Sequence, residues 1–374
     1  MKSITPRLLL ICSATLLAAL LATFVYEPPA SGASVNGDNF NTSRFKGGLT
    51  NPTSMVFAPD GRIFVTEQRG TLRVIKDGRL STFKKLGGVD SRGERRLLGV
   101  ELDPKFSENG YMYVYYTKKG SRSQNRIVRL TADGNQFKPG SFKTLFRLNK
   151  LSSAQNHNGG AIHFGKDGKL YAAVGDNKRD KDAQGLRNVF GKMLRLNPDG
   201  SIPRDNPFYG KARGKGKATW ARGLRNPFSF AVQPGSGKIF INDVGQQEWE
   251  EINRGVARGN YGWPRYEGPE SNKRFKPPIY AYRHDGRKSR TGCAITGGTF
   301  YNPQNVQFPS KFVGKYFFAD FCNGWVRKLS PNSKKVSGFA RGFSNPVDLD
   351  VGPDGNLYVL ERGSGSIARI RHTG

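Results

Sequence analysis

The sequence predicts an all-β protein, and more specifically a six-bladed β-propeller. Glycine (47 residues) and proline (21 residues) are abundant, as expected for many short strands joined by turns. No long stretch after the N-terminus shows sustained helical periodicity. A strand–turn–strand unit recurs six times at intervals of roughly 45 to 70 residues, and repeats of this length are typical of propeller blades.

The six copies can be followed along the chain, each as an apolar segment, a turn and a second apolar segment. A single blade would expose both faces of its sheet, whereas a closed ring of six buries them. The C-terminal segment 367–370 is expected to complete a blade begun by N-terminal residues and so close the ring. The paired segments are 52–61 with 62–67, 98–104 with 111–116, 161–168 with 170–174, 229–234 with 238–242, 296–301 with 314–320, and 347–355 with 357–360.

Residues 1–33 do not belong to the repeats. Basic residues precede an apolar run over 8–26, and small residues follow it. This pattern indicates a secretory signal peptide, and the run is also long enough to remain as an N-terminal membrane anchor. We therefore expect residues 34–48 to form an N-terminal segment and 49–374 the propeller. The protein is expected to be exported, either to the periplasm or out of the cell.

Export changes how the three cysteines are interpreted. Cys12 lies in the leader, which leaves Cys293 and Cys322 as an even pair in an oxidising compartment. We expect a disulfide between them, because a metal site would need more ligands.

The charge balance is strongly basic, with 60 Lys and Arg against 29 Asp and Glu and a formal net charge of +31. Such a charge attracts polyanions and anionic surfaces. Nucleic acid is not the expected partner, because the sequence carries no recognisable nucleic-acid module and begins with an export signal. An anionic envelope polymer or an acidic polysaccharide fits better. Solubility or adaptation to a habitat is the alternative explanation.

One histidine and one aspartate have a spacing that suggests chemistry. His157 lies in the glycine turn 156–160, and Asp176 ends the segment 169–176. If the residues between them form a β-hairpin, its out-and-back path returns Asp176 to the level of His157. A carboxylate that holds an imidazole in one tautomer makes the histidine a competent base. The alternative is a turn histidine beside a turn aspartate with no catalytic role.

Several segments together resemble the glucose/sorbosone dehydrogenase family, soluble quinoproteins that use pyrroloquinoline quinone (PQQ). The resemblance covers nearly everything after residue 45, with the motifs in order and near the expected spacing. The segments that carry it are 93–106, 157–160 with Asp176, 191–200, 223–228, 243–253 and 259–264.

The resemblance implies roles for individual residues. His157 would be the general base that takes the proton from the sugar's anomeric hydroxyl, and Asp176 would orient it. Arg225 would stabilise negative charge on the cofactor as it is reduced. Asn226 would lie beside Arg225 on the cofactor, and Glu94 would be a polar contact near the substrate and cofactor.

Calcium is implied in the same way. The backbone carbonyls of Gly245 and Gln246 match the loop that holds the cofactor's Ca²⁺. Glu251 and the Tyr261 carbonyl match a structural Ca²⁺ position. Oxygen ligands supplied by loops are the kind that Ca²⁺ requires.

The chain also departs from the family pattern where the cofactor's carboxylates are held. Cys322 stands at the position of a lysine, and Asn345 and Val347 stand at the positions of two arginines. A tri-carboxylate cofactor needs cationic partners, and the candidates to replace the missing cations are Lys315, Arg327 and Arg341. The cysteine pair also resembles Hedgehog-interacting-protein-like propellers, in which sugar oxidation is not a given.

The function expected from the sequence is that of an exported, PQQ- and Ca²⁺-dependent dehydrogenase that oxidises the anomeric carbon of an aldose sugar. The alternative is a non-catalytic propeller that binds an anionic glycan or a protein partner through its basic surface. A Ca²⁺-dependent hydrolase or lactonase is a third possibility, since six-bladed propellers also host that chemistry. Fold alone does not decide among them.

Overall fold

The computed structural model describes residues 32–37, 39–269, 273–284 and 291–374. Most of the predicted leader, residues 1–31, lies outside the described residues, and the predicted boundaries at 33 and 48 stay predictions. Within the described ranges, no helix is both long and apolar enough to cross a membrane.

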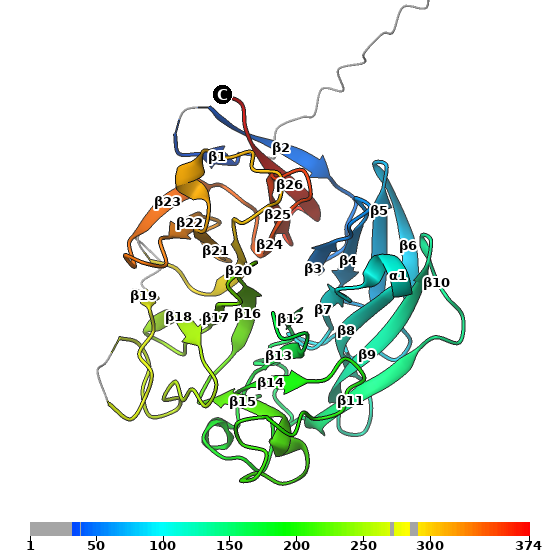
Figure 1. Cartoon of the computed structure of the whole chain (residues 1–374), viewed down its shortest axis with the longest axis vertical. Coiled ribbons are helices and arrows are strands. Elements are labelled where there is room, and N and C mark those ends of the chain that lie inside the picture. The colour runs from blue at the N-terminus through cyan, green and yellow to red at the C-terminus, as the bar shows by residue number, and fades with distance from the viewer. Residues whose placement is uncertain (1–31, 38, 270–272, 285–290) are drawn as a thin grey trace, which may run out of the picture.

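Six antiparallel sheets are arranged as a ring around a central axis, which confirms the predicted six-bladed propeller (Figure 1). Cavities lie along this axis between the innermost strands, and we call this space the channel. In each blade the first strand named below lines the channel and the last lies at the rim. The first three blades are β3 (Pro52–Phe57), β4 (Ile63–Glu67), β5 (Thr71–Lys76) and β6 (Arg79–Lys85); β7 (Leu97–Leu102), β8 (Tyr111–Lys118), β9 (Gln124–Asp133), β10 (Gln136–Phe137) and β11 (Lys143–Lys150); and β12 (Ile162–Phe164), β13 (Leu170–Val174), β14 (Lys192–Leu196) and β15 (Thr219–Arg222).

The remaining three blades repeat this order, and N-terminal strands are added to the rims of the last two. These blades are β16 (Pro227–Val232), β17 (Ile239–Asp243), β18 (Trp249–Gly255) and β19 (Tyr280–Arg283); β20 (Ile295–Phe300), β21 (Tyr316–Asp320), β22 (Val326–Leu329), β23 (Val336–Arg341) and β1 (Ser34–Val35); and β24 (Pro346–Val351), β25 (Leu357–Glu361), β26 (Ser366–His372) and β2 (Phe40–Lys46). Helical structure is limited to α1 (Phe106–Asn109) and three 3₁₀ turns among the residues that the structure covers.

The ring is closed by the N-terminal strand β2, which pairs with the C-terminal strand β26. The register sets Phe40 opposite His372 and Asn41 opposite Arg371. The prediction that the C-terminal segment shares a blade with N-terminal residues is therefore confirmed. The closure also caps the edge of β26, which would otherwise expose unpaired backbone groups.

The hydrophobic core lies mainly between neighbouring blades. One cluster, for example, combines Phe64 and Val74 of the first blade with Val100 and Val114 of the second. The second strands β4, β13, β17, β21 and β25 are buried along their whole length. These strands are apolar on both faces because each face packs against an adjacent blade.

The strand order brings the loops of interest to one end of the channel. Glu94, His157 and Asn226 lie just before the innermost strands β7, β12 and β16. Asp176 and Gly245 lie just after the second strands β13 and β17, which run antiparallel to the innermost ones. All five therefore gather at the same end, which we call the His157 face.

Candidate active site

His157 and Asp176 form a buried pair at the His157 face. Strands β12 and β13 make the predicted hairpin, with Ile162 opposite Ala172. His157 Nδ1 lies 2.7 Å from Asp176 Oδ1, and the two side chains are 6% and 0% exposed. The predicted hairpin and the predicted contact between His157 and Asp176 are confirmed. The catalytic roles of the two residues stay predictions.

The Asp176 carboxylate is held by two further donors. Its Oδ2 accepts a hydrogen bond from Trp263 Nε1 at 2.8 Å, and its Oδ1 accepts one from the Lys178 backbone N–H at 2.8 Å. Both carboxylate oxygens are thus satisfied without solvent. Sequence reasoning had placed Trp263 in a family motif but had assigned it no role.

The backbone around His157 is unusually constrained. Its φ angle is 54°, in the left-handed region that non-glycine residues rarely adopt. The carbonyl of His157 accepts a hydrogen bond from Asn177 N at 3.1 Å. A Cβ on Gly175 would lie 2.2 Å from that carbonyl, so only glycine fits beside it. The close packing fixes the direction in which the imidazole points.

The hydrogen bonds also fix the tautomer of the imidazole. A carboxylate is an acceptor, so Nδ1 of neutral His157 carries the proton and donates it to Asp176. The lone pair is then on Nε2, for which the described part of the chain supplies no hydrogen-bond partner. This is the arrangement required of a general base.

Glu94 and Asn226 connect three blades behind the His157 turn. Glu94 Oε2 accepts hydrogen bonds from His157 N at 2.8 Å and from Asn226 Nδ2 at 3.2 Å. Asn226 Oδ1 in turn accepts one from Gly159 N at 3.2 Å. The structure thus brings these predicted site residues together, with part of each side chain engaged in positioning the turn.

Arg225 lies beside this cluster. Its Nη1 donates hydrogen bonds to the carbonyls of Val244, at 3.0 Å, and of Gly245. The guanidinium carbon lies 5.5 Å from the centre of the Trp263 ring, so Trp263 contacts both the cation and the Asp176 carboxylate. The Arg225 Nε is buried and has no hydrogen-bond partner among the described residues. A free donor of this kind suits an anionic or carbonyl ligand.

The residues predicted to bind calcium lie close together. Gly245, Glu251 and Tyr261 line one small cavity, which Asp243 and Glu267 also line. Burial raises the pKa of Asp243 well above its ordinary value and that of Glu251 to about 7. A divalent cation would relieve the cost of these buried carboxylates, and oxygen donors of this kind suit Ca²⁺.

The loop predicted to hold the cofactor's Ca²⁺ is held by two side chains of the protein. The Gly245 carbonyl accepts a hydrogen bond from the Arg225 guanidinium. The Gln246 N–H donates a hydrogen bond to Glu267 Oε1 at 2.8 Å. Glu267 Oε1 also accepts the next three backbone N–H groups, at 3.1 to 3.3 Å, so one carboxylate shapes the whole loop. Sequence reasoning missed Glu267, which lies about twenty residues along the chain from the loop that it holds.

Cys293 and Cys322 form the expected disulfide, with their Cα atoms 5.8 Å apart. Their backbone N–H groups both donate to Asp320, at 2.9 and 3.1 Å. Together with Asp320 they are the one group of three His, Cys, Asp or Glu ligand atoms within 4.8 Å that the described ranges contain. Because both thiols are in the disulfide, this is not a metal site, and it supplies no positive charge at the predicted lysine position.

The three basic residues suggested as replacements lie at different places. Lys315 precedes β21, at the opposite end of the channel, and donates to Ser330 Oγ at 2.6 Å. Arg327 belongs to the third strand of its blade, with its guanidinium 3.9 Å from the centre of the Trp325 ring. Arg341 ends β23, nearer the rim. Lys315 therefore lies away from the His157 face, whereas the suggestion that Arg327 or Arg341 replaces a missing cation stays a prediction.

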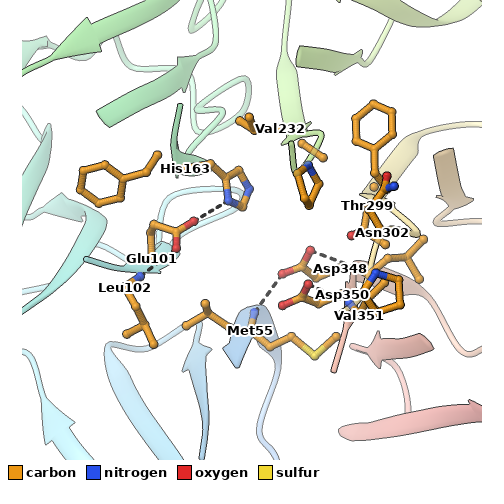
Figure 2. A pocket seen from close by; sticks show the side chains of 18 of the residues that line it. Met55, Glu101, Leu102, His163, Val232, Thr299, Asn302, Asp348, Asp350 and Val351 are labelled. Atoms are coloured by element: carbon orange, nitrogen blue, oxygen red, sulfur yellow. Dashed lines mark hydrogen bonds and ion pairs between the residues drawn. The ribbon is translucent and has the colours of Figure 1, made fainter. Parts of the chain in front are cut away.

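A second cavity, which sequence reasoning missed, lies at the opposite end of the channel. Its volume is about 360 Å³, and it is lined by the later residues of the innermost strands. His163 Nδ1 lies 2.6 Å from Glu101 Oε2, and this pair faces Asp348 and Asp350 across the cavity (Figure 2). Burial raises the pKa of Asp348 to about 6 and that of Asp350 to about 7.

Known proteins resemble the chain over most of its length. The family model described as glucose / sorbosone dehydrogenase matches residues 49–369. The chain is 30% identical over 347 residues to aldose sugar dehydrogenase YliI of Escherichia coli strain K12, covering 86% of this chain and 90% of that protein. It is 28% identical over 330 residues to quinoprotein glucose dehydrogenase B of Acinetobacter calcoaceticus, covering 79% and 67% of the two chains.

A solved structure and a more distant relative complete the comparison. The apo-form of the soluble aldose sugar dehydrogenase from Escherichia coli superposes with a TM-score of 0.78 and 28% identity, covering 89% of this chain and 99% of that one. The hedgehog-interacting protein of Mus musculus is 29% identical over 359 residues. That match covers 84% of this chain but only 49% of the relative.

Proposed function

Because the chain belongs to the glucose/sorbosone dehydrogenase family, we propose that it is an exported dehydrogenase that oxidises the anomeric carbon of an aldose, using PQQ and Ca²⁺. The observation that carries the proposal is the buried pair of His157 and Asp176, which leaves Nε2 as a base. Arg225, a cation suited to stabilising developing negative charge, lies next to this pair across Trp263.

The proposed reaction converts an aldose to its lactone, so a hydride leaves C1 and a proton leaves the anomeric hydroxyl. Bound PQQ supplies the hydride acceptor. His157 Nε2 takes the proton, and the Asp176 carboxylate stabilises the imidazolium because it touches Nδ1 at 2.7 Å. Trp263 keeps the carboxylate in place through its 2.8 Å hydrogen bond.

Residues beside the His157–Asp176 pair fit the proposed cofactors, although Cys322, Asn345 and Val347 supply no charge for the quinone's carboxylates. Arg225, with its unpartnered buried Nε, and Asn226 would hold the quinone. The carbonyls of Gly245 and Gln246 would bind the Ca²⁺ beside it. Since Arg225 already donates to the Gly245 carbonyl, a cation there would compete with that bond. Glu251 and Tyr261, which line the small cavity with Asp243, would hold a second, structural Ca²⁺.

Dye-linked turnover tests the proposal. The protein, mixed with PQQ and Ca²⁺, should reduce an artificial dye when a suitable aldose is added. Removing either the quinone or, with a chelator, the Ca²⁺ should stop the reaction. Hydrolysis of a lactone without quinone, stopped by chelator, would instead support a Ca²⁺-dependent hydrolase and contradict the dehydrogenase.

A second candidate function is that of a non-catalytic propeller that binds an anionic glycan or a protein partner. The net charge of +31 favours it, as does the replacement of predicted cofactor-binding cations by Cys322, Asn345 and Val347. A relative named for its interaction with a protein partner shows similarity across most of this chain.

Chromatography on an acidic polysaccharide tests this second function. A binding propeller should be retained at low salt and released as ionic strength rises, because screening weakens long-range charge attraction. The His157→Gln variant should be retained on the acidic polysaccharide as strongly as the wild type. Equal elution on neutral and acidic polysaccharide would contradict the binding function.

Export is part of the same proposal. The basic and apolar pattern of residues 1–33 supports it, and the Cys293–Cys322 disulfide is suited to an oxidising compartment. Fractionation of cells that express the full chain and a chain without residues 1–33 tests it. Only the full chain should reach the periplasm or the medium.

A further inference from the structure

Two neighbouring arginines, Arg95 and Arg96, are buried in different ways. They are only 3% and 7% exposed. Arg95 donates to the Asp90 carboxylate at 3.0 Å and to the carbonyls of Ser152 and Ala154 at 2.7 and 2.9 Å. The Arg96 guanidinium, in contrast, donates no hydrogen bond to any residue that the structure covers; the Nε atoms of both arginines are buried without a partner there.

An unpartnered guanidinium is expensive to bury. Desolvation penalises the charged form, and burial lowers the pKa of Arg96 to about 10. Removing a charge from water without a partner costs several kcal/mol as an order of magnitude. The backbone of Arg96 is nevertheless fixed, since its carbonyl accepts a hydrogen bond from the Thr117 backbone N–H at 2.9 Å. The position is therefore suited to a group that the protein itself does not supply.

The surroundings of Arg96 place that group in the channel. Arg96 lines a small cavity with Thr53, Phe228 and Val347, which are early residues of the innermost strands near the His157 face. Its guanidinium carbon lies 5.8 Å from the centre of the Phe228 ring. A cation–π contact with an aromatic ring orients a guanidinium without using its N–H donors.

Two charges near Arg96 act on an anion in opposite directions: the Glu94 carboxylate disfavours it and the Arg362 guanidinium favours it. Glu94 is close enough to raise the pKa of Arg96 and Arg362 close enough to lower it. Glu94 Oε2 is already engaged with His157 N and Asn226 Nδ2. Arg362 donates to the Asn51 carbonyl at 3.2 Å, so its charge too is held beside the channel. An anion between the two guanidinium groups would reduce their repulsion.

We propose that Arg96 binds a carboxylate group of the ligand that enters the channel at the His157 face. The inference rests on the proposed function, since that carboxylate belongs either to PQQ or to an acidic sugar substrate. Val347, which stands where the family resemblance places an arginine, lines the same cavity. A guanidinium from the second blade thus provides the charge that the sixth blade lacks. Planar, bidentate recognition of carboxylates is what arginine does best.

Thermal stability without ligand tests the first part of this proposal. Arg96→Met should raise the melting temperature, because it replaces a buried guanidinium that donates to none of the described residues with an apolar side chain of similar length. Arg95→Met, the matched control, should lower it, because it leaves Asp90 and two carbonyls without their donor. A lower melting temperature for Arg96→Met would show a structural role and overturn the proposal.

Ligand titrations followed by absorbance and by melting temperature test the second part. PQQ, its neutral trimethyl ester and galacturonate are added, with Ca²⁺ present, to the wild type, Arg96→Met and the rim variant Arg79→Met. Arg96→Met should weaken binding of PQQ or galacturonate at least tenfold, as expected for a lost charge-assisted pair. It should not change binding of the ester, and Arg79→Met should match the wild type.

Each outcome separates this inference from the proposed function. Loss of PQQ binding in Arg96→Met assigns the carboxylate to the cofactor, and loss of galacturonate binding alone assigns it to the substrate. If PQQ binds the wild type and Arg96→Met with equal affinity, and galacturonate also binds both with equal affinity, the inference about Arg96 fails while the proposed function stands. If PQQ binds neither the wild type nor Arg96→Met, but galacturonate raises the melting temperature of the wild type only, the cofactor proposal fails and the carboxylate site stands. If no carboxylate binds, both fail.

Discussion

The ring nitrogen of His157 that faces Asp176 cannot also accept a proton from a substrate, because it already carries one. The buried carboxylate therefore decides which nitrogen is the base, and Trp263 decides where the carboxylate lies. Another histidine, His163, is paired with a carboxylate in the same channel. Because that pair lines the cavity at the opposite end of the channel, its loss shows the effect of breaking a histidine–carboxylate pair other than His157–Asp176.

Substitution of Asp176 by Asn should leave the fold intact and lower turnover by about 10²- to 10⁴-fold, the usual contribution of a positioned base. The amide would no longer select the Nδ1–H tautomer of His157. His157→Gln should show a loss of the same size, and the double variant should lose little more, because the two residues act as a unit. His163→Gln should keep near wild-type turnover. Additive losses would contradict a catalytic pair.

Asp350 predicts a pH dependence of stability. Its pKa is raised to about 7 by burial and by the Asp348 charge, against about 3.9 in an unfolded chain. Between these values the folded protein holds a proton that the unfolded chain has released, so the free energy of unfolding falls as pH rises from about 4 to 7. Asp350→Asn should thus be more stable than wild type above pH 7, by roughly 1–3 kcal/mol.

Denaturant unfolding at pH 4.5 and pH 8 measures this effect. The two proteins should have nearly equal stability at the lower pH and should differ at the higher one. A constant difference between them would show that Asp350 does not titrate in this range.

At the level of elements, the site depends on where strands begin and end. The β12–β13 hairpin pairs His157 with Asp176, and the β17–β18 connection carries the loop that Glu267 holds. None of these loops is fixed unless the ring is closed. Closure relies on β2, where Phe40 contacts the rings of Phe308 and Phe339 at 4.9 and 5.3 Å.

Phe40→Ala should lower the free energy of unfolding by about 2–4 kcal/mol, because it removes an aromatic ring packed between two blades. Phe142→Ala is the matched control, since Phe142 is 41% exposed and its loss should cost less than about 0.5 kcal/mol. Chemical denaturation of both variants measures the difference. An equal effect of the two substitutions would show that β2 does not hold the ring closed.

The carboxylates beside β17 and β18 predict a stabilising effect of calcium. Added Ca²⁺ should raise the melting temperature by mass action, and a chelator should reverse the rise. Glu251→Gln should remove most of the effect, because the buried carboxylate supplies an essential charge to the cavity shared with Asp243. Mg²⁺ should be a weak substitute, because it requires a tighter octahedral geometry. An unchanged rise in Glu251→Gln would place the ion elsewhere.

At the scale of the whole molecule, the ring explains which features of the site could be predicted from the sequence. The repeat gave the six blades, and a hairpin is local enough for spacing alone to bring Asp176 to His157. Trp263 reaches Asp176 from 87 residues further along the chain. Its contact depends on how two blades pack, which no local pattern encodes.

Arg96 illustrates the same limit. Its sequence position beside Arg95 gives no sign that one guanidinium donates three hydrogen bonds within the protein and the other donates none to the described residues. That difference arises because Arg95 points toward Asp90, while Arg96 lines a cavity that strands of five blades surround. The opposite cavity around His163 and Asp350 also requires several innermost strands to converge. Such features become visible only in the assembled ring.

Titration of the protein with PQQ in the presence and absence of Ca²⁺, followed by absorbance, is the decisive test of the proposed dehydrogenase. A quinoprotein dehydrogenase should give a saturable spectral change that requires Ca²⁺, in wild type and in His157→Gln alike, and bleaching on addition of an aldose in the wild type only. If the spectrum of PQQ does not change at saturating protein and Ca²⁺, the protein is not a quinoprotein dehydrogenase.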